Sequence, residues 1–162
     1  MAEGEFALVK DHLAAAGSKP VVMRGGLVVN DNILYFMWAD LAVLRRDEAG
    51  LRQYAPLAED MARRDGHILF QASAHRAWGV LHRLTGDYVE AEARLNQALG
   101  LFQELETRWQ IGRTLFELAE LAVARTDSTV ARDCFSRALE IFEAIRANPD
   151  AVRIREALRS LD

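Results

Sequence analysis

The apolar positions of the chain follow a helical spacing that is interrupted at regular intervals. One helical pattern ends at Thr85-Gly86-Asp87 and another begins at Tyr88, which predicts the turn of a helical hairpin. The same design returns forty residues later at Thr126-Asp127, and a degenerate copy lies forty residues earlier at Arg46-Asp47. We therefore predict a small array of helical repeats.

Three hairpins are expected, over residues of about 27–66, 67–107 and 108–147. Their paired helices are predicted at about Leu27 to Arg46 with Glu48 to Arg64, His67 to Leu84 with Tyr88 to Glu106, and Trp109 to Ala124 with Ser128 to Arg146. Strand patterns are poor throughout. The one candidate, Val21 to Met23, is short and ends at two glycines, so we interpret it as a connection.

The segment before the array is expected to form a separate unit, residues 1–26, ahead of a repeat domain at 27–162. Phe6, Val9 and Leu13 share one helical face and predict a short helix over residues 4–16. The linker that follows contains Pro20 and is expected to let this helix fold back on the array.

A closing helix is predicted over residues 149–161. Asn148 and Pro149 suit the cap and the first helical position, where proline loses only an N–H that has no partner. Ala151, Ile154 and Leu158 share a face that can seal the last repeat, while the arginines on the other face meet water.

Superposing the hairpins at the period of forty aligns similar residue types. Small residues, at Ala39, Gly79 and Ala119, fall where two helix backbones should cross closely, and large ones fill the space beside the crossing. In the second helices, the aligned sets are Ala91 with Ala131, Leu95 with Phe135, and Phe102 with Phe142. The second helix of the first unit matches only after a one-residue shift, which pairs Gly50 with Ala91 and Tyr54 with Leu95.

The series Trp78-Gly79, Gly86-Asp87-Tyr88 and Ala91-x3-Leu95 resembles the tetratricopeptide repeat, over roughly residues 27–147. The resemblance implies an all-α, right-handed solenoid whose concave wall is formed by the first helix of each unit. The period of forty exceeds the usual 34 or so residues, which implies longer helices. Such long units are similar to those in the C-terminal arrays of MalT-type bacterial regulators, so the chain is expected to act in bacterial signalling or regulation, either alone or as part of a longer protein.

The composition of the chain narrows the classes of partner that we expect. The formal net charge of −4 and the lack of any basic run argue against nucleic acid or an anionic membrane surface. No apolar run is long enough to span a membrane. The single cysteine, Cys134, cannot form an internal disulfide, which favours a cytoplasmic location.

No residues stand out as catalytic or metal-binding, and no cofactor is expected. His75 and His82 share a helical face, but they fall at core positions of the repeat, and a metal site needs at least three converging ligands. Cys134 has no histidine placed near it by the repeat, and no phosphate-binding loop or nucleophile elbow occurs. We therefore expect a chain that is not an enzyme.

The resemblance implies a binding role for the concave wall, in a mixed set of residues that leans apolar. Carried over from the family, these groove positions are Ile33, Phe36, Asp40, Val43, Ser73, Arg76, Val80, Arg83, Arg113, Phe116, Glu120 and Val123. The expected partner is a peptide, helix or neighbouring protein domain. Three alternatives remain open: a homodimer, occupation of the groove by the helix at 4–16, and a small-ligand sensor.

Overall fold

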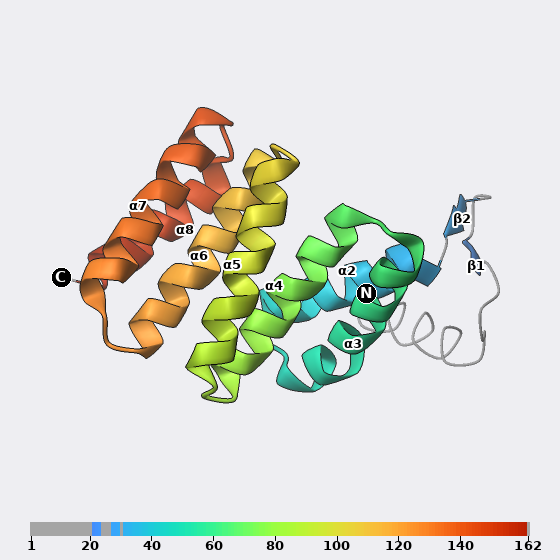
Figure 1. Ribbon diagram of the computed structural model, residues 1–162. Coiled ribbons are helices and arrows are strands. Elements are labelled where there is room, and N and C mark those ends of the chain that lie inside the picture. Colours follow the sequence, from blue (N-terminus) through green and yellow to red (C-terminus); the bar gives the residue numbers. More distant parts are fainter. Residues whose placement is uncertain (1–20, 24–26, 30, 162) are drawn as a thin grey trace, which may run out of the picture.

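The computed structural model describes residues 21–23, 27–29 and 31–161 and confirms an all-α helical repeat solenoid. Seven helices succeed one another through this part of the chain, from α2 and α3 at one end to α7 and α8 at the other (Figure 1). They are α2 Asp31–Arg45, α3 Glu48–Asp65, α4 Ile68–Leu84, α5 Tyr88–Glu104, α6 Arg108–Ala124, α7 Ser128–Ala144 and α8 Asn148–Arg159.

A short antiparallel pair of strands, β1 Val21–Met23 and β2 Leu27–Val29, precedes the helices, with Val21 opposite Val29. The interpretation of Val21–Met23 as a connection was therefore wrong, and the first helix begins at Asp31 rather than Leu27. Two apolar, mostly β-branched triplets separated by a segment with two glycines are typical of a hairpin, and this pattern outweighs the helical spacing. The predicted helix at 4–16 lies outside the described residues.

The turns between helices repeat every twenty residues. Each contains one residue in the left-handed conformation, with φ between 52° and 85°, at Arg46, Gly66, Gly86, Glu106, Thr126 and Arg146. The residue that follows donates its backbone N–H to the carbonyl five positions back, as Asp87 does to His82 at 2.9 Å and Thr107 to Phe102 at 3.1 Å. This bond satisfies a carbonyl that the helix end leaves unpaired. Helices α3 to α8 therefore all begin at the same phase of a twenty-residue period.

The first unit keeps this register, so the predicted one-residue shift was wrong. Asp47, Asp87 and Asp127 each cap a helix by accepting a hydrogen bond from the backbone N–H three residues on. With these caps aligned, Leu51 takes the position of Ala91 and Ala55 that of Leu95, and both are fully buried. The small and large residues have exchanged places in this unit, which misled the alignment by residue size.

Gly79 lies at a close crossing of α4 and α5, as the repeat pattern predicted. A Cβ atom at this position would lie 2.6 Å from Cγ of Leu95 and 3.2 Å from the backbone oxygen of Ala91. Any side chain would therefore push the two helices apart.

The closing helix α8 is capped by Ala147 rather than Asn148, and Pro149 stands at its second position. The prediction was one residue late, but the N–H that proline lacks would still have had no partner there. Ala151 and Ile154 are buried in a cluster with Phe142, so one face of α8 covers the end of the array.

We expect Glu106→Gly to raise the free energy of unfolding by about 0.5–1 kcal/mol, because it removes the cost of a left-handed conformation at a residue with a Cβ atom. Glu106 is exposed, so little packing is lost. The measurement is the urea midpoint at constant slope. The matched control is Gln103→Gly, at an exposed position inside α5, which should lower stability by about 0.5–1 kcal/mol. Equal changes in the free energy of unfolding for the two substitutions would contradict a left-handed conformation at Glu106.

Candidate functional site

The first helices of the units, α2, α4 and α6, form the inner side of the array, since α4 packs against both α2 and α6. Side chains of α2 also reach α6 directly. Asp40 accepts a hydrogen bond from Arg113 at 2.7 Å, and Arg46 donates to Glu117 at 2.6 Å, although these residues are more than seventy positions apart. The curvature of the array therefore brings the first and third units together across the second.

Asp40 is the centre of one ionic cluster on this inner wall. Its two carboxylate oxygens accept hydrogen bonds from Arg76 at 2.8 Å and from Arg113 at 2.7 Å. Burial acts to raise the pKa of Asp40, but the two guanidinium groups outweigh burial and hold the pKa below its ordinary value. Asp40 therefore stays charged at neutral pH.

Arg76 is the most buried cation of the wall, with no exposed surface. It donates to Gln110 at 2.6 Å as well as to Asp40, and its guanidinium lies 5.1 Å from the ring centre of Phe102. Burial lowers the pKa of Arg76 to about 10, with Arg113 adding to the effect, so Arg76 is still cationic at neutral pH.

Glu117 is the centre of a second cluster. It accepts hydrogen bonds from Arg46 and, at 3.3 Å, from Arg83, while both arginines also lie within 4 Å of Glu120. Burial lowers the pKa of Arg83, although Glu117 opposes this. Together the two clusters contain four arginines and three carboxylates. We call this set of ion pairs on the inner wall the ionic lattice.

The lattice leaves some donors unused. Among the described residues, four buried nitrogen atoms lack a hydrogen-bond partner: Nη2 of Arg46, Nε of Arg76, Nε of Arg83 and Nη2 of Arg113. Buried donors without a partner cost free energy, so the wall is held with incomplete hydrogen bonding.

The twelve predicted groove residues divide by their exposure. Val43, Ser73, Arg76, Val80, Arg113 and Phe116 are buried, Phe36, Asp40, Arg83 and Glu120 are partly buried, and Ile33 and Val123 are exposed. The structure brings the charged members together in the two clusters, and it uses Val43 and Val80 in the core between α2, α3 and α4. Their role in partner binding stays a prediction, and the surface open to a partner is narrower than the sequence suggested.

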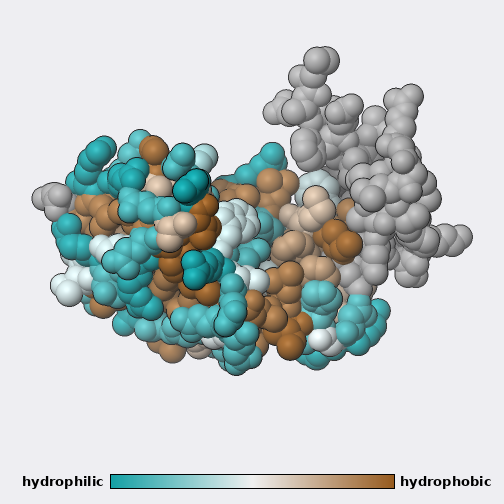
Figure 2. All heavy atoms as spheres, turned by 90° about the horizontal axis from the view of Figure 1, so that it is seen from above, coloured by the Kyte–Doolittle hydropathy of each residue, from teal (hydrophilic) through white to brown (hydrophobic). Residues whose placement is uncertain are grey.

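Two accessible residues of α2 were missed. Met37 is 56% exposed and Leu44 is 49% exposed, and both lie on one helical face with Ile33. The available signal was their spacing of four and eleven residues from Ile33 in a helix that is apolar on most sides. Figure 2 shows that hydrophobic residues, in brown, reach the surface as separate patches between hydrophilic ones.

A small cleft of about 70 Å³ adjoins this stripe where α2, α6 and α8 meet, lined by Leu44, Trp109 and Arg153 among others. Its aromatic rings are covered by cations: Arg113 lies 4.7 Å from the ring centre of Trp109, and Arg153 lies 4.2 Å from that of Phe116. Trp109 is still 43% exposed, so the cleft offers an aromatic surface to a partner.

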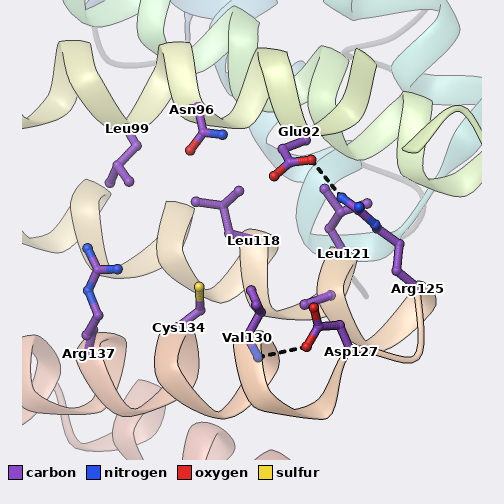
Figure 3. A pocket seen from close by; sticks show the side chains of 11 residues that line it. Glu92, Asn96, Leu99, Leu118, Leu121, Arg125, Asp127, Val130, Cys134 and Arg137 are labelled. Atoms are coloured by element: carbon purple, nitrogen blue, oxygen red, sulfur yellow. Dashed lines mark hydrogen bonds and ion pairs between the residues drawn. The ribbon is translucent and has the colours of Figure 1, made fainter. Parts of the chain in front are cut away.

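A larger pocket, of about 230 Å³, lies on the other side of α6, between α5 and α7 (Figure 3). Its floor includes Leu118 of α6, and the sulfur of Cys134 points inward from α7 (Figure 3). An ion pair at 2.6 Å between Glu92 and Arg125 closes one end. Sequence reasoning did not find this pocket, because it results from what the side chains leave empty.

His75, His82 and Cys134 were weighed as chemical candidates in the sequence, and the structure places each in a packed setting. Burial lowers the pKa of His75, whose Nδ1 lies 3.1 Å from Nη1 of Arg94, and His82 stacks on Trp78. Burial raises the pKa of the Cys134 thiol, which disfavours the reactive thiolate. Within the described residues, no three His, Cys, Asp or Glu side chains gather as a metal site, and no helix is long and apolar enough to cross a membrane.

We expect Asp40→Asn to lower the free energy of unfolding by about 3 kcal/mol, because it leaves Arg76 and Arg113 buried without their counter-ion. Chemical denaturation at pH 7 measures this. Since the pKa of Asp40 is lowered in the folded state, its contribution should be lost only as the pH falls below about 4. The control is Asp60→Asn, which breaks an exposed pair with Arg64 and should cost less than about 0.5 kcal/mol. Equal costs for the two variants would show that Asp40 does not hold the wall together.

Comparison with known proteins agrees with this geometry. Residues 70–144 match the family model of the tetratricopeptide repeat. No curated protein matches the chain. The match begins near the start of α4 and ends at the last residue of α7, so it covers the two hairpins whose motifs are best preserved. Residues 70–144, which span most of two helical hairpins, therefore match the tetratricopeptide repeat that their sequence pattern predicted.

Proposed function

We propose that this chain is a non-catalytic protein-interaction module that holds a peptide, a helix or a neighbouring domain against the inner side of its array. Tetratricopeptide repeats generally mediate contacts between proteins. We further propose a role in bacterial signalling or regulation in the cytoplasm, which rests on the resemblance of the 40-residue units to those expected in MalT-type regulators.

The observation that carries the proposal is the exposed apolar stripe of α2, which consists of Ile33, Met37 and Leu44. Leu44 also lines the cleft beside Trp109, so the stripe continues from the first unit towards the third. Accessible apolar side chains in a row on one helix are typical of a surface that another helix or an extended peptide covers.

The ionic lattice contributes stiffness to this surface rather than contacts. Arg76 and Glu117 are buried and bonded to neighbouring helices, so their charges serve mainly the array, although Glu117 also lines the cleft. Because the ion pairs fix α2 relative to α6, the stripe and the cleft keep the same relative position before a partner binds. A preorganised surface loses less conformational entropy on binding.

We expect the double variant Met37→Glu, Leu44→Glu to reduce the capture of a protein partner from a bacterial lysate at least about tenfold, because burying one such side chain contributes about 1.5–3 kcal/mol. Quantitative mass spectrometry of the captured proteins is the measurement. The matched control is Val89→Glu, which changes an apolar side chain that is 82% exposed on α5.

A protein captured by the wild type and by Val89→Glu, but not by the double variant, supports the proposal. Equal capture by all three proteins contradicts it. Light scattering tests self-association: a wild-type dimer that the double variant converts into a monomer would assign the stripe to homodimerisation instead.

A further inference from the structure

The pocket between α5 and α7 has a counterpart one repeat earlier, between α3 and α5, and the two differ in what fills them. Because the turns keep a period of forty per hairpin, each residue of the pocket has a defined equivalent in the earlier groove. Comparing the two grooves shows which groups one of them contains and the other lacks.

In the groove between α3 and α5, the indole ring of Trp78 occupies the space above α4, the first helix of the second unit. Trp78 donates its Nε1–H to Glu59 at 3.0 Å, and its ring stacks on His82 with centres 5.7 Å apart. Arg94 lies 5.8 Å from the centre of the same ring and pairs with Glu59 at 2.9 Å. The indole and three side chains around it, from α3, α4 and α5, thus occupy this groove.

The four equivalent positions between α5 and α7 carry Leu99, Leu118, Ala122 and Cys134. All four line the pocket. Each is smaller or less polar than its counterpart, so these four positions supply no indole, imidazole or guanidinium. The pocket is therefore the space that an indole and its neighbours fill one repeat earlier.

The charges at the rim favour a neutral occupant. Glu92 is paired with Arg125, Arg137 pairs with Asp133 at 3.3 Å, and Asp127 accepts a hydrogen bond from the N–H of Val130 as a helix cap. Three of the four lining charges thus belong to ion pairs, and the fourth, on Asp127, is engaged as a helix cap. Asn96, on α5, adds an uncharged amide that can accept a hydrogen bond from a ring N–H.

The size of the pocket favours a single side chain. Its volume of about 230 Å³ lies below the range of about 300–1,000 Å³ that is usual for sites of drug-sized molecules. Aromatic side chains that insert into such pockets are common anchors of protein interfaces.

We propose that the outer groove between α5 and α7 is a second docking site, which receives one neutral aromatic side chain, indole-like in size, from a protein partner. The ring would lie over Leu118 and Cys134, in the place that the chain fills with Trp78 in the preceding groove. This site is on the side of α6 away from the α2 stripe and does not depend on it.

Cys134 provides the readout, because it is the one cysteine of the chain and its sulfur lines the pocket. The probe is N-acetyl-tryptophanamide, a neutral mimic of a tryptophan within a chain, and the measurement is the rate of alkylation by iodoacetamide. We expect millimolar binding, and an alkylation rate lowered about tenfold at about ten times the dissociation constant. N-acetyl-alaninamide should leave the rate unchanged.

Two substitutions copy the second repeat into the third and should close the pocket. Leu118→Trp and Ala122→His introduce the residues found at 78 and 82, and either should abolish the protection by the probe. If one variant does not fold, the other gives the same readout. Val89→Trp, which adds an indole at an exposed site, is the control and should keep the protection.

Three results would overturn the proposal. They are an alkylation rate that the probe does not change, protection that persists in the folded Leu118→Trp or Ala122→His variant, and protection by free indole without protection by N-acetyl-tryptophanamide. The last result would assign the pocket to a small free molecule and not to a side chain of a partner.

Discussion

The turn that recurs every twenty residues is the constraint on which the rest of the structure depends. Each turn reverses the chain with one left-handed residue and returns the next helix to the same phase. A given position in a unit therefore meets the same neighbours in every hairpin. The strictness of this period has a cost, since Arg46, Glu106, Thr126 and Arg146 adopt a conformation that favours glycine. That cost is tolerated because any slip in phase would misplace a whole apolar face.

A fixed phase means that differences between units come from side chains alone. The inner wall shows this, because Asp40, Val80 and Glu120 are equivalent positions with different roles. Asp40 neutralises two arginines of the later units, Val80 is core, and Glu120 belongs to the second cluster. The ion pairs join residues that are not equivalent, since the helices cross at an angle and the curvature brings α2 to α6.

Much of the fold could be predicted from local signals. Apolar spacing located the helices of the array, and Thr85-Gly86-Asp87 marked a turn that the structure confirms. The turn at Glu106 has no glycine to mark it, because the repeated bonding and packing impose a conformation that the residue itself disfavours. The capping aspartates indicate the correct register of the first unit. Residue size indicates a wrong one, because in this unit the large residue, Leu51, stands where the later units have a small one, and Ala55 stands where they have a large one.

The site was predicted less completely, for a physical reason. A family pattern places residues on the inner wall, but exposure depends on contacts across units that the pattern does not contain. Arg76 and Arg113 looked accessible but are buried, and both pair with Asp40, a carboxylate more than thirty residues away. Met37 and Leu44 looked like further core residues and are exposed, because no described helix covers that face of α2. The outer pocket exists because four positions carry smaller or less polar side chains than their equivalents one repeat earlier. That comparison requires the correct alignment of the repeats, which the structure supplied.

The two faces of α6 differ in whether their side chains can be displaced, and this difference suits the faces to different partners. Towards α2 and α4, Arg113 and Glu117 are buried in ion pairs, and displacing either would leave a charge without its partner in the interior. Towards α5 and α7, Leu118 and Ala122 contact an open space with the Glu92–Arg125 pair at one end, so a side chain can enter without breaking an ion pair. The inner face thus presents a fixed surface and the outer face a pocket that can be filled. A partner long enough to reach both would gain affinity from two weak contacts held at a constant separation by one rigid helix.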